Sequence, residues 1–270
     1  MRFTKMQGLG NDYVYINGMK ETVEEPEKLA IRFSDRHFGI GADGLIVIGG
    51  SKVADVRMEM YNADGSRGMM CGNGIRCVAK YAYEQGIVSK KMIRIETLSG
   101  IKETLILSDG DVQVNMGRPK VEQIRQEITI EVLGGKRITS DCISMGNLHR
   151  ILYLNELQET EQMECLELER IGSVLECLGG EAHRRNVEVV KVLDRNTLEM
   201  RVWERGTGET LACGTGACAA TVSSILRNLT EREVRIKLKG GNLLVKWGGD
   251  SRDLYMTGPA VTVFKGDITV

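Results

Sequence analysis

Hydrophobic and polar positions alternate over most of the chain, a pattern that predicts many short strands and few helices. The predicted strands of the first half are Tyr13–Ile16, Gly44–Ile48, Asp55–Tyr61, Met92–Thr97, Glu103–Ser108 and Val112–Asn115. Those of the second half are Arg150–Leu154, Asn186–Val192, Leu198–Trp203, Val234–Lys239, Asn242–Lys246 and Leu254–Thr257. Helical spacing of apolar residues predicts helices at Glu25–Arg36, Gly74–Gln85, Cys165–Cys177 and Gly216–Arg227.

Two of these helices follow similar glycine-rich turns, MMCGNGIRCVAKY at residues 69–81 and LACGTGACAATV at residues 211–222. Further pairs recur at nearly the same spacing: IRIETLSG with VRIKLKGG, VNMGRP with LYMTGP and, more loosely, GNDYVY with GNLHRI. Because the pairs keep the same order in both halves, the sequence indicates an internal duplication.

The duplication and the element pattern predict an α/β (α+β) fold of two pseudo-symmetric domains. Each domain is expected to wrap a mostly antiparallel sheet or barrel around one central helix. The expected boundary follows Pro119, in the polar stretch Lys120–Glu127, which gives domains 1–119 and 120–270. A C-terminal strand at about 262–270 is expected to pack back on the first domain. A ligand site is expected in the cleft between the domains.

Composition and charge exclude several function classes. Hydrophobic residues make up 42% and the formal net charge is −1, so no electrostatic capture of nucleic acid or of an anionic membrane is expected. No segment approaches the ~20 apolar residues of a membrane helix. The N-terminus lacks the apolar core of a secretion signal, so a cytoplasmic location is expected.

The cysteines fit neither a disulfide framework nor a zinc site. The chain has 7 cysteines, an odd number, and no CxxC pair, while its 3 histidines are not clustered. Free thiols and no metal are therefore expected. The segment GIGADG, Gly39–Gly44, matches a nucleotide-binding pattern, but it precedes a strand and is interpreted as a tight loop.

A cysteine at a helix start is chemically special. The first turn of a helix has unpaired N–H groups and partial positive charge, which lower a thiol pKa and attract carboxylates. The glycines let the backbone approach an anion closely. One such cysteine is most simply a small buried filler. Two matching ones, Cys71 and Cys213, favour a pair that removes an α-proton from one face of an amino acid and returns one to the other.

The surrounding motifs extend this pattern over nearly the whole chain. They are FTKMQGLGNDYV, DRHFGIGADGL, NADGS with CGNGIRC, SMGNLH and ERGTGETLACGTGACA. In these motifs the chain resembles the diaminopimelate epimerase family. The resemblance implies cofactor-independent epimerisation of LL-diaminopimelate to the meso form, by a Cys thiolate and a Cys thiol. It also implies a small-molecule substrate and a homodimer.

The resemblance carries roles over to matching positions. Cys71 and Cys213 become the acid/base pair, with His149 tuning Cys71 and Glu204 tuning Cys213. Arg205 is expected to clamp the distal carboxylate. Phe264 falls where the family often has a tyrosine at the dimer contact. The full set of expected substrate-binding residues is Asn11, Asn62, Gly72, Asn73, Asn147, Asn186, Glu204, Arg205, Gly214 and Thr215.

Three departures from the family pattern concern the substrate more than the reaction. Leu148 replaces a proline in the middle motif, Arg185 replaces a threonine before Asn186, and Arg67 replaces a glutamate. Because a lost proline loosens a loop, the distal end of the site could differ. A racemase of another amino acid, such as histidine or an acidic one, therefore stays open. So does a non-catalytic amino-acid-binding protein.

Overall fold

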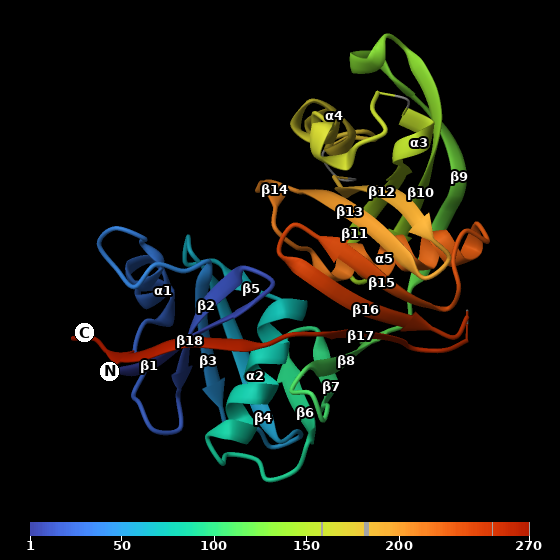
Figure 1. The fold of residues 1–270 in the computed structure, drawn as a ribbon. Coiled ribbons are helices and arrows are strands. Elements are labelled where there is room, and N and C mark those ends of the chain that lie inside the picture. Colours follow the sequence, from blue (N-terminus) through green and yellow to red (C-terminus); the bar gives the residue numbers. More distant parts are fainter. Residues whose placement is uncertain (158, 181–183, 250, 270) are drawn as a thin grey trace. The chain divides into compact units, whose positions relative to one another are not determined.

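The computed structural model describes residues 1–157, 159–180, 184–249 and 251–269. These residues form a mixed α/β protein dominated by strands (Figure 1). The chain divides into two compact units. Unit 1 comprises Met1–Asn115 and Thr257–Val270, and unit 2 comprises Met116–Met256. The predicted boundary region Lys120–Glu127 lies in a strand of unit 2.

Eleven of the described helices and strands lie mainly in unit 1, and β8 extends slightly past its boundary at Asn115. They are β1 (Arg2–Gly8), β2 (Asn11–Asn17), α1 (Pro26–Ser34), β3 (Gly44–Gly49), β4 (Val56–Asn62), β5 (Arg67–Gly68), α2 (Gly72–Glu84), β6 (Met92–Thr97), β7 (Gly100–Ile106), β8 (Val112–Gly117) and β18 (Val261–Asp267). Strands β2 and β3 run parallel, as do β4 and β6. The pairs β1–β2, β3–β4, β4–β5, β6–β7 and β7–β8 are antiparallel.

Unit 2 repeats this connectivity. Its elements are β9 (Lys120–Ile130), η1 (Glu131–Leu133), β10 (Lys136–Ser144), β11 (Leu148–Tyr153), α3 (Leu154–Leu157), η2 (Met163–Cys165), α4 (Leu168–Glu176), β12 (Asn186–Asp194), β13 (Thr197–Glu204), β14 (Gly208–Thr210), α5 (Gly214–Leu226), β15 (Glu233–Leu238), β16 (Gly241–Trp247) and β17 (Leu254–Gly258). The parallel pairs β11–β12 and β13–β15 correspond to β2–β3 and β4–β6. The pairs β10–β11, β12–β13, β13–β14 and β15–β16 are antiparallel like their counterparts in unit 1, which agrees with the duplication.

The last strand of each repeat pairs with the first strand of the other repeat. In unit 1, β18 runs antiparallel to β1, with Phe3 opposite Gly266. The two chain ends therefore lie side by side (Figure 1). In unit 2, β9 runs antiparallel to β10, with Ile138 opposite Ile128. Of the strand predicted at 262–270, Val270 lies outside the described residues.

Each unit holds one buried helix, as the sequence predicts. Helix α2 packs against β1, β2, β4, β6 and β7, and α5 packs against β10, β11, β12 and β16. Most side chains of both helices are buried, including the predicted core residues Cys77 and Cys218. A second apolar layer covers the other face of each sheet, with α1 in unit 1 and with α3 and α4 in unit 2.

The hydrophobic pattern missed five strands: β1, β9, β10 and the short strands β5 and β14. Strand β1 was hidden in a motif rich in polar residues and glycine, and β10 begins beside Gly134 and Gly135. Strand β9 was read as a polar connection because most of its first residues are exposed. The predicted helix at 165–177 was too long, since α4 begins only at Leu168 after a separate 3-10 turn.

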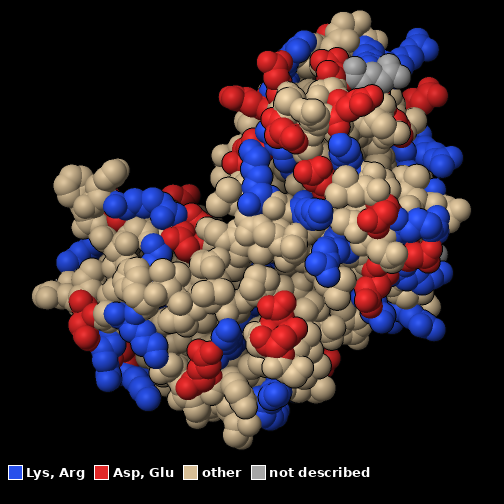
Figure 2. All heavy atoms as spheres, viewed as in Figure 1, with Lys and Arg blue, Asp and Glu red and all other residues tan. Residues whose placement is uncertain are grey.

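Figure 2 shows positive and negative side chains interspersed over the face it presents. Among the described residues, no helix is long and apolar enough to span a membrane.

Candidate active site

Cys71 lies directly before α2 and caps it. Its backbone is extended, with φ −124° and ψ 122°, and the Gly74 N–H donates to Sγ at 3.4 Å. The sulfur therefore lies at the N-terminus of a 13-residue helix, where partial positive charge stabilises an anion.

Asn11 holds the Cys71 thiol in a fixed direction. The thiol donates to Oδ1 of Asn11 at 3.1 Å, and Nδ2 of Asn11 donates to Oδ2 of Asp43 at 2.7 Å. Arg36 donates to the other oxygen of Asp43 at 2.9 Å. Because the amide gives its N–H side to a carboxylate, its oxygen faces the sulfur.

Sequence reasoning missed both Asp43 and Tyr13. Asp43 lies in the segment GIGADG, which leads into strand β3 as expected. The feature of the sequence that could have indicated Asp43 is an acidic residue among glycines. Tyr13 is buried in β2. Burial, and then the neighbouring Cys71, raise the pKa of the Tyr13 phenol well above its usual value, so the hydroxyl stays protonated at neutral pH.

The other predicted residues of unit 1 lie in two places. Gly72 and Asn73 form the first turn of α2, where Arg76 donates to the Gly72 carbonyl and to Asn73 Oδ1, both at 3.0 Å. Arg76 is fully buried and thereby fixes this turn. Asn62 ends β4, and its Nδ2 donates to Ser66 Oγ at 2.9 Å.

Cys213 caps α5 in the same way as Cys71 caps α2. Its φ and ψ are −120° and 111°, and the Gly216 N–H donates to Sγ at 3.4 Å. Burial raises the pKa of the Cys213 thiol well above its usual value, and the nearby carboxylates of Glu204 and Glu188 raise it further. The group is therefore a thiol at neutral pH.

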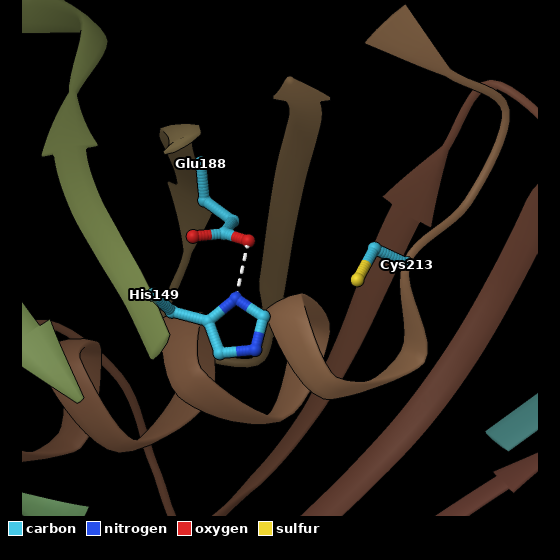
Figure 3. Close-up of side chains that lie close together, drawn as sticks. All are labelled: His149, Glu188 and Cys213. Atoms are coloured by element: carbon cyan, nitrogen blue, oxygen red, sulfur yellow. Dashed lines mark hydrogen bonds and ion pairs between the residues drawn. The ribbon is translucent and has the colours of Figure 1, made fainter. Parts of the chain in front are cut away.

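Two neighbouring parallel strands bring His149 and Glu188 together. The His149 Nδ1 lies 2.7 Å from Glu188 Oε1, and both side chains are completely buried. The Nε2 of His149 lies 3.1 Å from Asn147 Oδ1. Figure 3 shows the Cys213 sulfur facing this pair. His149 belongs to unit 2, so its expected effect on Cys71 stays a prediction.

In unit 2 the sequence reasoning missed Glu188. It lies in β12 inside the apolar run NVEVV, where a lone acidic residue was the available signal. An alanine Cβ at Gly216 would lie 2.5 Å from Glu188 Oε1, so a larger residue at this position in α5 would displace the Glu188 carboxylate.

The remaining predicted residues of unit 2 surround Cys213. Asn186 accepts from the Arg205 N–H at 2.9 Å, and its own Nδ2 lies 3.8 Å from the Cys213 sulfur. Burial raises the pKa of Glu204, whose Oε1 accepts from Thr210 at 2.5 Å. Gly214 begins α5, and the next residue, Thr215, accepts from Asn147 Nδ2 at 3.2 Å. The Arg205 side chain is exposed.

Comparison with known proteins gives the family. The sequence profile described as diaminopimelate epimerase matches residues 3–122 and 141–263. A diaminopimelate epimerase from Acetivibrio thermocellus is 48% identical over 99% of this chain and 98% of its own length. One from Methanococcus maripaludis is 44% identical over the full length of both chains. The chain belongs to the diaminopimelate epimerase family.

Solved structures with little sequence similarity share the fold. A probable proline racemase from Agrobacterium radiobacter superimposes with a TM-score of 0.76 at 17% identity, covering 100% of this chain and 93% of its own. A phenazine biosynthesis protein of the PhzF family from Bacillus anthracis gives 0.75 at 17% identity, covering 100% and 99%. At this identity the likeness concerns the fold alone, and it confirms the predicted fold class.

Two departures from the diaminopimelate epimerase family pattern have a local explanation. Arg185 pairs with Glu122 of β9 at 2.8 Å, and its side chain is 12% exposed. Arg67 lies 3.7 Å from Glu59. Each guanidinium thus meets a carboxylate of its own unit. Leu148 begins β11 opposite Ser144, and residues 181–183 before Arg185 lie outside the described residues.

Proposed function

We propose that this protein interconverts LL- and meso-diaminopimelate without pyridoxal phosphate, as an isomerase of the lysine and peptidoglycan precursor pathway. The observation that carries the proposal is the pair of cysteines that cap matching Gly-rich helices, one in each repeat of a chain that belongs to this family. In each Cys-Gly-x-Gly motif, the cysteine supplies a sulfur, and the residues that follow it supply the N–H groups of the first helical turn.

The chemistry is a two-base proton transfer at the α-carbon. A thiolate removes the α-proton from one face, and a thiol delivers a proton to the opposite face. In the intermediate, charge passes into the α-carboxylate. The N–H groups that begin α2 and α5, beside Gly72, Asn73, Gly214 and Thr215, are suited to stabilise this charge.

The reaction needs one thiol and one thiolate at the start of each turnover. Burial and two carboxylates keep Cys213 protonated, so Cys213 is the acid in the first turnover. Cys71 then serves as the base, and the reverse reaction exchanges the roles. A rate that needs one thiol and one thiolate is bell-shaped in pH. Glu204, beside Cys213, is proposed to exchange protons with this cysteine between turnovers.

The exposed Arg205 is proposed to bind the distal carboxylate, for which the guanidinium fork is well shaped. Asn11, Asn62, Asn147 and Asn186 are proposed to bind the amino and carboxylate groups.

A substrate panel in D₂O tests the proposal. The protein is incubated with LL-diaminopimelate, histidine, glutamate and proline, and deuterium at each α-carbon is measured by mass spectrometry. We expect rapid exchange with diaminopimelate and none with the others. Exchange with a different amino acid alone would give the protein another substrate, and no exchange with any would contradict the enzymatic function.

We also propose that the protein works in the cytoplasm as a homodimer that uses the β18 face. Phe264 is 44% exposed, although its ring packs edge-on against Phe3 at 5.9 Å. Val261 and Val263 on the same strand are also exposed. Sedimentation equilibrium is expected to give twice the chain mass, and Phe264→Asp is expected to give the single mass. A wild-type monomer at micromolar concentration would contradict the dimer.

A further inference from the structure

Cys213, His149 and Glu188 form a cluster with the donor atoms of a metal site. They come from the cap of α5 and from the adjacent strands β11 and β12, and their sequence positions gave no metal-binding spacing (Figure 3). One sulfur, one imidazole nitrogen and one carboxylate oxygen lie within 4.8 Å of one another, and all three residues are buried.

The cluster has an unsatisfied oxygen. Oε1 of Glu188 meets His149, but Oε2 is buried and has no hydrogen-bond partner. A buried carboxylate oxygen without a donor is costly. Glu204 adds a second, half-buried carboxyl group near Cys213. A divalent cation would balance the charge of these carboxylates and of a thiolate.

The three types of ligand atom in the cluster indicate which metal ion it would bind. Thiolate, imidazole and carboxylate are the ligands of Zn²⁺, with bonds of about 2.3 Å to sulfur and about 2.0–2.2 Å to nitrogen and oxygen. Three protein ligands leave the fourth tetrahedral position open. The contact of His149 Nε2 with Asn147 supplies the outer hydrogen bond that metal-bound histidines use. Asn147 itself is exposed.

We propose that Cys213, His149 and Glu188 bind Zn²⁺ and that bound Zn²⁺ reversibly inhibits the enzyme. Zn²⁺ replaces the thiol proton of Cys213 and the proton shared by His149 Nδ1 and Glu188 Oε1, and both protons are released to solvent. His149 coordinates through Nδ1 while its proton resides on Nε2 and is donated to Asn147. The sulfur then holds the ion and cannot deliver a proton. Inhibition rests on the proposed function, whereas binding does not.

Calorimetric titration of the full chain with ZnCl₂ tests binding. The titrated protein and all its variants carry Cys165→Ser and Cys177→Ser, because these two thiols are exposed and could bind Zn²⁺ themselves. We expect one high-affinity ion per chain and release of two protons, measured in buffers of different ionisation enthalpy. His149→Asn and Glu188→Gln should each weaken binding by at least about 10-fold, and Cys213→Ser should abolish the Cd²⁺–thiolate absorption band. Cys71→Ala is the matched control and should keep both the Zn²⁺ affinity and the Cd²⁺–thiolate absorption band.

Zn²⁺ binding with an unchanged Kd in Cys213→Ser would overturn the site. If a variant fails to fold, anomalous diffraction from wild-type crystals soaked in ZnCl₂ locates the ion instead. An anomalous peak away from Cys213, His149 and Glu188 would also overturn the proposed site.

The inhibition is tested separately. EDTA should restore activity to the Zn²⁺-loaded protein, and full activity with the site occupied would overturn inhibition alone. Failure of every amino acid in the D₂O panel would leave the calorimetric result standing, so the two proposals fail separately.

Discussion

Replacing either capping cysteine with alanine is expected to reduce kcat/KM for diaminopimelate by at least about 10³-fold, because positioned acid/base groups contribute about 10²–10⁴-fold each. Cys71→Ala removes the proposed base and Cys213→Ala the proposed acid. Loss of both should cost little more than loss of one, since the two groups act as a unit.

The measurement is the rate of interconversion followed by chiral chromatography, together with the circular dichroism of each variant. The matched control is Cys165→Ala, an exposed thiol away from both helix caps. Its kcat/KM should equal that of the wild type. Retention of activity in a folded Cys71→Ala or Cys213→Ala variant would rule out the two-thiol mechanism.

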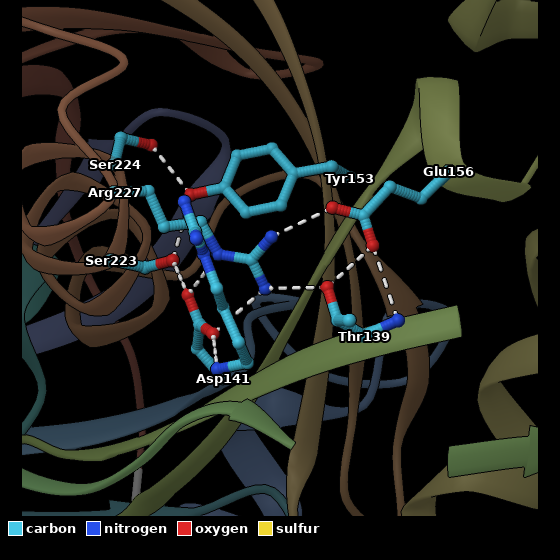
Figure 4. Close-up of polar contacts among 8 residues, drawn as sticks. Thr139, Asp141, Tyr153, Glu156, Ser223, Ser224 and Arg227 are labelled. Carbon is cyan, nitrogen blue, oxygen red and sulfur yellow. Dashed lines mark hydrogen bonds and ion pairs between the residues drawn. The ribbon is translucent and has the colours of Figure 1, made fainter. Parts of the chain in front are cut away.

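The largest effect on stability is expected at Arg227, at the C-terminus of α5. Its Nε and Nη2 donate to the two oxygens of Asp141 at 2.7 and 2.8 Å, and its Nη1 donates to Glu156 at 2.7 Å (Figure 4). Its guanidinium also stacks on Tyr153, 4.6 Å from the ring centroid. Arg227→Ala leaves the fully buried Asp141 without its cation, which should cost about 3–5 kcal/mol of unfolding free energy.

Urea denaturation followed by fluorescence measures this loss. The control is Arg170→Ala, whose half-exposed guanidinium pairs with Glu167 at 3.2 Å and whose removal should cost less than about 1 kcal/mol. The double variant Asp141→Asn/Arg227→Met should recover part of the stability, because it removes both buried charges. Equal effects of Arg227→Ala and Arg170→Ala would show that the network contributes no more than a surface pair.

The sequence predicted the two central helices because each starts at a glycine-flanked cysteine and continues as an amphipathic or apolar segment. It predicted β2 and β3 because strands buried on both faces are continuously apolar. Strand β9 escaped because much of its surface faces solvent, so its residues resemble a connection. Such a segment forms a strand only when a neighbouring strand is available for pairing. The composition of the segment itself does not encode that neighbour.

The candidate site was predicted to a similar extent. Cysteine-glycine turns and family motifs pointed to Cys71, Cys213 and His149. Glu188 and Asp43 were missed, since each acts through a residue far away in sequence. Glu188 reaches His149 only because β12 runs beside β11, and Asp43 reaches Asn11 only because β3 runs beside β2.

The exchange of terminal strands sets an order for folding during synthesis. Unit 2 is one continuous segment, so it can fold as soon as Met256 has left the ribosome. Unit 1 begins at Met1 but lacks β18 until residues 261–267 emerge. Until then β1 exposes unpaired backbone groups, a template for wrong pairing. Although the N-terminal unit is translated first, it is therefore the last to be completed.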